Sequence, residues 1–260
     1  MVTVVTASPP TLLQLSDPHL QADPAALLHG VNGQAALEQA LAICQARCGR
    51  PDLLLLSGDL CHDESWLGYA RLRELLRDRS AAVALLPGNH DDPALLRCAL
   101  GRHAVLAPAA LWLGEWRLVL LDSHRAGCLG GRLGERQLHW LAQELASCSA
   151  PLLLAVHHPP LPIGDPGLDA ICLEDGPALM ALLRQRPGPV LVLFGHIHQH
   201  WQNHSGGPLL FGCPSTLAQF KAVQPCPLGR PDDAGGRWLT LASGGDFRQR
   251  LLRWSAADSP

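Results

Sequence analysis

Five short polar clusters in this chain each follow directly after an apolar run, and they contain residue types that bind metals or move protons. The clusters are Ser16-Asp17-Pro18-His19, Gly58-Asp59, Gly88-Asn89-His90-Asp91, His157-His158 and Gly195-His196-Ile197-His198. A lone D-x-H or G-D is uninformative, but G-N-H-D is expected by chance only about 0.001 times in a chain of this composition, and G-H-x-H about 0.06 times. Because ligands bind at the carboxyl ends of strands in an α/β sheet, we expect these side chains to converge.

The donor atoms of these clusters suit a pair of divalent metal ions. Carboxylate or amide oxygens and imidazoles occur together without a thiolate, which suits Mn, Fe or Zn and suits Ca or a structural zinc poorly. The seven candidate ligands are Asp17, His19, Asp59, Asn89, His157, His196 and His198. Seven ligands are too many for one ion, whereas two ions that share a bridging carboxylate use the whole set and leave positions for water. Such a pair is suited to phosphoryl displacement.

The elements that must position these clusters alternate between strands and helices. Strands are predicted at Thr11 to Leu15, Asp52 to Ser57, Ala81 to Leu86, Trp116 to Asp122, Leu152 to Val156 and Val190 to Phe194. Helices are predicted at 34–48, at 64–78, after the N-cap Asp92 with Pro93 in first position, at about 134–147 and near 176–186. Short strands near 208–212, 237–242 and 247–254 are expected to be antiparallel, and the Pro- and Gly-rich stretch 224–236 is expected to be a surface loop. This order predicts an α/β layered fold with one mixed sheet or two sheets, in a single domain of residues 1–260.

Composition excludes several other classes of protein. Of the 260 residues, 47% are hydrophobic and 17% are charged, so the chain can bury a core and is not expected to be disordered. Its nine cysteines include no C-x-x-C pair, which favours reduced thiols in the cytoplasm. Without a basic, apolar leader or an apolar run of about 20 residues, we expect no membrane partner and a cytoplasmic location. The formal net charge of -3 disfavours a nucleic-acid partner.

Taken together, the polar clusters resemble the motif series D-x-H, G-D, G-N-H-D, H-x-P and G-H-x-H of the calcineurin-like metallophosphoesterases. Within that family, the chain between the motifs is similar to the bacterial class III 3′,5′-cyclic-AMP phosphodiesterases. The similar segments are Gly30-Val31-Asn32, Leu121-Asp122-Ser123, Gln137-Leu138-His139-Trp140-Leu141, Pro214-Ser215-Thr216 and Gln219-Phe220. The resemblance runs from about residue 11 to the last predicted strand, so it covers nearly the whole chain.

The resemblance implies a four-layer αββα sandwich of two mixed sheets flanked by helices. It implies that one metal ion is bound by Asp17, His19, Asp59 and His198. It implies that the second ion is bound by Asp59, Asn89, His157 and His196, so that Asp59 bridges the two. The H-H-P-P segment offers two imidazoles, and we choose His157 because the family ligand stands two residues before the proline.

The activity implied by the resemblance is hydrolysis of 3′,5′-cyclic AMP to 5′-AMP by attack of a metal-bridging hydroxide. Asn89 and His90 are the expected catalytic side chains, since the amide would hold a phosphoryl oxygen and the imidazole would protonate the leaving 3′ oxygen. The residues expected to contact the substrate are His19, Asp59, Asn89, His90 and His198. One alternative is another small diester, such as a glycerophosphodiester or a 2′,3′-cyclic nucleotide. A less favoured alternative is a non-catalytic interaction module on the same scaffold, and the sequence leaves open whether the chain forms a homodimer.

Overall fold

The computed structural model of the chain describes residues 2–4, 9–204 and 207–258, and the described strands form two mixed sheets. The seven-stranded sheet has the spatial order β1 (Val2–Val4), β6 (Ala109–Leu113), β7 (Trp116–Leu120), β8 (Leu152–Ala155), β9 (Val190–Phe194), β11 (Leu209–Gly212) and β10 (Trp201–Asn203). The six-stranded sheet has the order β13 (Phe247–Trp254), β12 (Ala234–Leu241), β2 (Thr11–Leu15), β3 (Leu53–Leu56), β4 (Ala82–Leu85) and β5 (Val105–Leu106).

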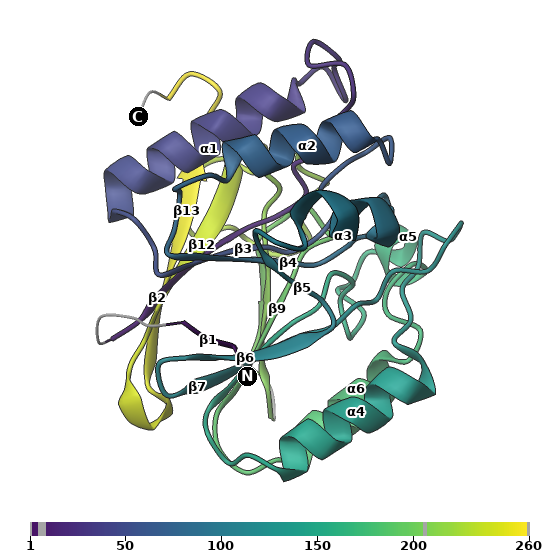
Figure 1. Cartoon of the computed structure of the whole chain (residues 1–260), viewed down its shortest axis with the longest axis vertical. Helices are drawn as coiled ribbons and strands as arrows, with labels where there is room; N and C mark the ends of the chain where they lie inside the picture. Colours follow the sequence, from purple (N-terminus) through teal and green to yellow (C-terminus); the bar gives the residue numbers. More distant parts are fainter. Residues whose placement is uncertain (1, 5–8, 205–206, 259–260) are drawn as a thin grey trace.

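Helices cover the outer face of each sheet. The helices α1 (Gly33–Cys48), α2 (Trp66–Leu75) and α3 (Pro93–Leu100) pack on the six-stranded sheet, and α4 (Gly134–Ala146) and α6 (Gly176–Arg184) pack on the seven-stranded sheet. Figure 1 shows α1 and α2 above the sheets and α4 and α6 below them. Two short pieces complete the described helices, α5 (Pro166–Asp169) and the 3₁₀ turn η1 (Ser243–Gly245). The expected four-layer αββα sandwich is therefore confirmed.

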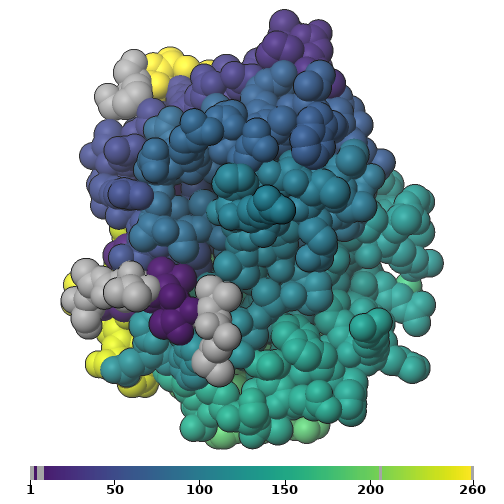
Figure 2. All heavy atoms as spheres, in the orientation of Figure 1, coloured from purple at the N-terminus to yellow at the C-terminus, as the bar shows by residue number. Residues whose placement is uncertain are grey.

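The helix starts and the outer surface agree with the sequence pattern. Asp92 caps α3 by accepting hydrogen bonds from the backbone of Ala94 and Leu95, with Pro93 in the first turn as predicted. In the space-filling view, blue residues from the first half of the chain cover the upper part of one face, and teal and green residues cover its lower part (Figure 2). No helix in the described part of the chain is both long enough and apolar enough to cross a bilayer.

The leucine runs in the strands are continuous because both faces of each sheet are covered. In β3, Leu53 and Leu55 belong to the core between the two sheets, whereas Leu54 and Leu56 belong to the core beneath α1, α2 and α3. All four side chains are fully buried. Strands buried on both faces show no alternation of apolar and polar residues. In β3, polar side chains begin only beyond the carboxyl end of the strand, where the cluster with Asp59 lies.

The prediction of an antiparallel strand near 208–212 is correct for one of its two neighbours and wrong for the other. The strand β11 lies between β9 and β10; it is parallel to β9 and antiparallel only to β10. The chain leaves β9, runs back as the short outer strand β10, and then returns into the gap beside β9. The expected antiparallel pairing of the last two strands is confirmed, since β12 pairs antiparallel with β13.

Other differences concern short or glycine-containing segments. The strand β12 begins at Ala234, inside the stretch predicted as a loop, because residues 234–236 pair with residues 252–254 of β13 and this pairing outweighs the low strand propensity of glycine. The prediction also missed β6, which forms a hairpin with β7 around Gly114 and Glu115. Also missed were β1, β5, β10 and α5, none of which is longer than four residues.

The core between the sheets should dominate the stability of the fold. We expect Leu55→Ala to lower the free energy of unfolding by about 2–5 kcal/mol, because the removed methyl groups leave a cavity between two sheets that cannot collapse freely. Urea unfolding followed by circular dichroism measures this loss. As a control, Leu67→Ala on α2 removes the same atoms from a side chain that is 58% exposed, and we expect it to change stability by less than about 0.5 kcal/mol. Equal midpoints for the two variants would contradict the assignment of this core.

Candidate metal centre

The five polar clusters meet where the carboxyl ends of the two sheets lie against each other. The clusters that contain Asp17, Asp59 and Asn89 follow β2, β3 and β4 of the six-stranded sheet. The clusters that contain His157 and His196 follow β8 and β9 of the seven-stranded sheet. The backbone N–H of His196 donates to a carboxylate oxygen of Asp17 at 3.2 Å, which joins the ends of the two sheets. The structure brings together all the predicted site residues, which are Asp17, His19, Asp59, Asn89, His90, His157, His196 and His198.

Four of these residues form a first group of metal-type ligands. The ligand atoms of Asp17, His19, Asp59 and His198 all lie within 4.8 Å of one another. The Nε2 atoms of His19 and His198 are 3.3 Å apart, and His19 Nε2 is 3.6 Å from Asp59 Oδ2. His198 Nε2 is 3.4 Å from Asp17 Oδ1. This is the set expected for one metal ion.

The second group shares Asp59 with the first. His157 Nε2 lies 3.4 Å from Asp59 Oδ1 and 3.3 Å from Asn89 Oδ1. His196 Nδ1 lies 3.0 Å from the same Asn89 oxygen. Asp59 thus presents Oδ1 to this group and Oδ2 to the first group, which is the arrangement required of a bridging carboxylate.

The protonation of two of the imidazoles indicates what the centre can bind. His157 Nδ1 is 2.8 Å from the carbonyl oxygen of Ser57, and His198 Nδ1 is 2.8 Å from that of Ala218. A carbonyl oxygen only accepts, so each Nδ1 carries a proton, and in the neutral form of the ring, which is the form that binds a metal ion, each Nε2 presents a lone pair. These lone pairs face oxygens of Asp17, Asp59 and Asn89, so acceptors face acceptors. Ligands bound to one ion at about 2.1 Å lie about 3.4 Å apart in a tetrahedral arrangement, which matches these separations and fits a cation in each group.

The charges of the two buried carboxylates reinforce that requirement. Burial raises the pKa of Asp17, but the facing His198, together with His157 and His19, outweighs burial and holds the pKa well below its usual range. Burial and the neighbouring charge of Asp17 raise the pKa of Asp59 to about 7. Like charges this close in a buried site repel each other unless a cation lies between them.

Burial opposes protonation of His198, but the charges of Asp17 and Asp59 outweigh it and raise the pKa of His198, whereas two other imidazoles, those of His19 and His196, are kept neutral. Burial and the nearby ring of His157 lower the pKa of His196 to about 3. Burial and the ring of His198 lower the pKa of His19 well below its ordinary value. Neutral imidazole is the form that binds a metal ion, so the centre keeps these side chains ready for coordination.

The backbone of the centre is strained. Left-handed φ angles between 44° and 66° occur at five of the site residues, namely Asp17, His19, Asp59, His196 and His198. Each such non-glycine residue costs about 1–3 kcal/mol and persists only where the surroundings hold it. Backbone hydrogen bonds between neighbouring loops stabilise this conformation. The N–H of Asp17 donates to the carbonyl of Gly58, and the N–H of His19 donates to the carbonyl of Asp59.

Two motif positions must be glycine because ligand side chains press against them. A Cβ atom at Gly88 would lie 2.1 Å from Asp59 Oδ1. A Cβ atom at Gly58, whose φ is +104°, would lie 2.2 Å from His157 Nδ1. Glycine at these positions lets the carboxylate and the imidazole occupy the space in which they face the other ligands.

The two neighbouring histidines after β8 have different surroundings. Both ring nitrogens of His158 have partners outside the centre, because Nδ1 lies 2.8 Å from the Ser123 hydroxyl and Nε2 lies 3.0 Å from the carbonyl of Leu129. His157 instead points its Nε2 at Asp59 and Asn89. This geometry favours His157 over His158 as the ligand.

Asp91 has a role in the centre that the sequence analysis missed. Its buried carboxylate accepts hydrogen bonds from the backbone N–H groups of Leu60, Cys61 and Gly88 and from the hydroxyl of Tyr69. Burial and the charge of Asp59 raise the pKa of Asp91 to about 7. Asp91 therefore links the loop after β3 to the loop after β4. Its position as the last residue of the G-N-H-D motif was the one sequence feature that pointed to this role.

A cavity of about 200 Å³ opens above the centre. Its polar lining comes from ligand residues and from His29, His62 and His90. Its apolar lining consists of Leu28, Leu129, Leu168, Ile171 and Phe220. Phe220 stacks on the ring of His198 with centroids 4.4 Å apart and an interplanar angle of 15°. The cavity thus has a polar floor and an apolar rim. His62 and the apolar residues come from the short α5 and from loops that share no local pattern in the sequence.

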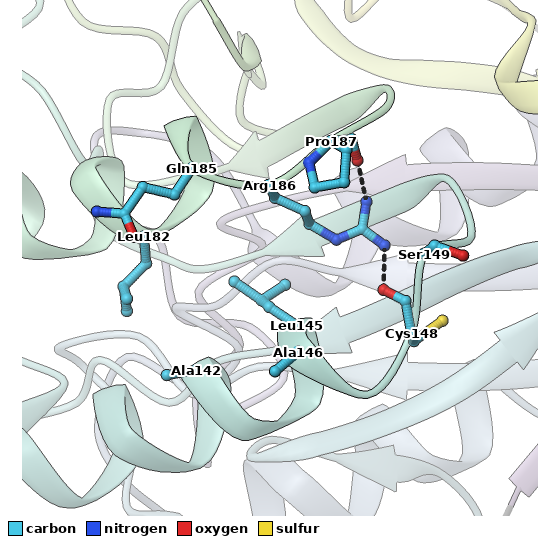
Figure 3. Close-up of a pocket in the computed structure, with 9 residues that line it drawn as sticks. All are labelled: Ala142, Leu145, Ala146, Cys148, Ser149, Leu182, Gln185, Arg186 and Pro187. Carbon is cyan, nitrogen blue, oxygen red and sulfur yellow. Dashed lines mark hydrogen bonds between the residues drawn. The ribbon is translucent and has the colours of Figure 1, made fainter.

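A second cavity, of about 390 Å³, lies between α4 and α6 and is lined mainly by aliphatic groups (Figure 3). Its one charged side chain, Arg186, is turned toward Cys148 and Pro187 and donates to the backbone carbonyls of Cys148, Ala150 and Pro187. The lining residues include no carboxylate or imidazole. The chemistry of the molecule is therefore assigned to the cavity above the polar clusters.

Comparisons with known proteins agree with this geometry. The calcineurin-like phosphoesterase family profile matches residues 10–200. The chain is 46% identical to a probable cyclic nucleotide phosphodiesterase of Synechococcus sp. strain WH7803, over 96% of this chain and 98% of the relative. It is 36% identical to the 3′,5′-cyclic adenosine monophosphate phosphodiesterase CpdA of Pseudomonas aeruginosa, over 96% and 92% of the two chains. A dimetal phosphatase from Danio rerio has a similar fold, with a TM-score of 0.64 at 17% identity over 95% of this chain and 99% of the other. The chain described here belongs to the calcineurin-like phosphoesterase family.

Proposed function

We propose that the chain is a phosphodiesterase with two divalent metal ions that hydrolyses 3′,5′-cyclic AMP to 5′-AMP, acting as one domain over residues 1–260. The observation that carries the proposal is the buried centre in which the Nε2 atoms of His157 and His198 face carboxylate and amide oxygens at the floor of a cavity. The names of the Synechococcus and Pseudomonas relatives support the substrate class.

The ligand groups divide into two sites. Asp17, His19, Asp59 and His198 would hold the first ion, and Asp59, Asn89, His157 and His196 would hold the second. Imidazole, carboxylate and amide donors suit Mn, Fe or Zn. A bound pair of such ions supplies a water molecule with a pKa lowered toward about 7 and positive charge for the phosphoryl oxygens.

Asn89 and His90 would bind the phosphoryl group and protonate the leaving oxygen. With Oδ1 of Asn89 turned toward His157 and His196, its Nδ2 group is left to donate to a phosphoryl oxygen. The backbone N–H of His90 donates to Asp59 Oδ1 at 2.9 Å, which fixes the residue at the edge of the centre. Its ring lines the cavity, where it can donate a proton to the leaving 3′ oxygen. Burial lowers the pKa of His90, and the negative charge of a bound diester would favour its protonated form.

The cavity supports a small substrate. A cyclic phosphate would lie on the polar floor, in contact with His19, Asp59 and His198, while ribose and base would meet the rim of Leu28, Phe220 and the other apolar side chains. A polynucleotide needs an extended basic surface, and the formal net charge of -3 does not favour one. We place the activity in the cytoplasm, a proposal that the nine free cysteines support.

The number of metal ions bound per chain should depend on the carboxylate of Asp59, which the two ligand groups share. We expect the purified protein, after reconstitution with Mn²⁺ and removal of excess metal, to retain about two ions per chain. Asp59→Asn should retain fewer than one, because it removes negative charge and a strong oxygen ligand from both groups. Inductively coupled plasma mass spectrometry measures the ratio.

The matched control for this measurement is Asp78→Asn. Asp78 is exposed and also has a left-handed φ, of 59°, so the same substitution in the same backbone conformation should leave the metal ratio unchanged. Retention of two ions by Asp59→Asn would show that Asp59 does not bridge.

The substrate assignment is tested by chromatography of 5′-AMP formed from 3′,5′-cyclic AMP in the presence of Mn²⁺. We expect Asn89→Ala to lower kcat/KM by about 10²- to 10³-fold, because it removes one second-site ligand and one donor to the phosphoryl group.

We expect His90→Gln to lower kcat by about 10²-fold or more, because the leaving oxygen then departs without a proton donor.

A panel of diesters separates the alternatives. Faster cleavage of a 2′,3′-cyclic nucleotide or a glycerophosphodiester than of cyclic AMP would keep the reaction class and replace the substrate. A metal-loaded protein that cleaves none of these diesters would overturn the enzymatic proposal and favour an interaction module.

A further inference from the structure

His62 lies three residues beyond Asp59 in the loop after β3, and it lines the cavity above the metal centre. Its Nδ1 is 3.3 Å from Nδ1 of His19. The other ring nitrogen of His19, Nε2, is the atom that faces Asp59 and His198. His62 therefore contacts His19 from behind, on the side of the ring opposite the ligand group.

We propose that His62 is a positioning residue that accepts a hydrogen bond from the Nδ1–H of His19 and thereby holds His19 in the tautomer that binds the first metal ion. The inference rests on the proposed function, because it requires that His19 binds metal through Nε2. A histidine that binds metal through one ring nitrogen carries its proton on the other, and that N–H needs an acceptor that fixes the orientation of the ring.

The other Nε2-directed imidazoles of the centre already have such acceptors. The Nδ1–H of His157 donates to the carbonyl of Ser57, and the Nδ1–H of His198 donates to the carbonyl of Ala218, both at 2.8 Å. For His19 the corresponding atom is Nδ1 of His62. The three imidazoles then share one arrangement, in which a lone pair points into the centre and a proton points to an acceptor behind it.

The hydrogen bond determines the tautomer of His62 as well. A neutral imidazole has one donor and one acceptor, so His62 must accept at Nδ1 and carry its own proton on Nε2. The ring of His62 also packs against the ring of His90, with centroids 4.6 Å apart and a tilt of 31°. His62 thus lies between a proposed metal ligand and the proposed proton donor.

Two substitutions separate the acceptor from the bulk of the side chain. His62→Gln keeps an oxygen that can accept from His19, whereas His62→Leu fills similar space without an acceptor. We expect His62→Leu to weaken Zn²⁺ binding at one of the two sites by about 10- to 100-fold and to leave the other site unchanged. His62→Gln should stay within a few-fold of the original protein. Titration of the metal-free 260-residue protein with Zn²⁺ against a chromogenic chelator gives both dissociation constants.

The control removes an exposed imidazole far along the chain, His139→Leu on α4, and should not change either constant. Equal affinity in His62→Leu and the original protein would overturn the inference while leaving the proposed function intact. Equal losses in His62→Leu and His62→Gln would also overturn it, since shape and not the acceptor would then matter. An original protein that binds no Zn²⁺ would instead overturn the proposed function, and this inference with it.

A second measurement requires no variant to fold. Imidazole ¹⁵N NMR of the zinc-loaded protein at a pH near 8 reports which ring nitrogen of each histidine carries the proton. We expect His19 as the Nδ1–H form and His62 as the Nε2–H form. A His62 ring protonated at Nδ1 would rule out the proposed hydrogen bond.

Discussion

The arrangement on which the site depends is a set of buried acceptors that face one another. Asp17 and Asp59 lie close together in a buried position, and the Nε2 atoms of His157 and His198 point at them. In a buried site such a group is unfavourable unless cations occupy the space between its members. The arrangement therefore accounts for both the expected chemistry and the cost that the rest of the fold must offset.

The fold meets this cost by anchoring each ligand to a rigid element. The ligands stand at the carboxyl ends of strands whose leucines are buried on both faces, so the strand ends cannot shift without disturbing two hydrophobic cores. Left-handed residues such as Asp17 and His196 then turn the chain sharply, and the bond from His196 N–H to Asp17 ties one sheet to the other. The strained conformation of these turns persists because the sheets, the glycines and Asp91 hold the loops in place.

The sequence predicted the parts of the molecule that depend on local pattern. Each ligand belongs to a short motif directly after an apolar run, so its residue type and its place at a strand end could both be predicted. The direction of β11 could not, because it depends on the gap that β10 leaves beside β9. The role of His62 and the stacking of Phe220 on His198 also escaped prediction, since each depends on contact between loops distant in the sequence.

The cavity above the centre has a polar floor of candidate ligands and an apolar rim, and the two parts would have different functions. The floor carries the proposed reaction, and its candidate ligands lie at strand ends that the hydrophobic cores hold in place. The rim is built by Leu28, Leu129, Leu168, Ile171 and Phe220, which lie outside the described strands and helices except for Leu168 in the short α5. Loops tolerate substitution better than strands. Under the proposed function, changes in the rim would therefore alter which diester is accepted while the floor keeps the same phosphoryl chemistry. The reaction class would then depend on the ends of the two sheets, and the substrate preference would depend on the loops.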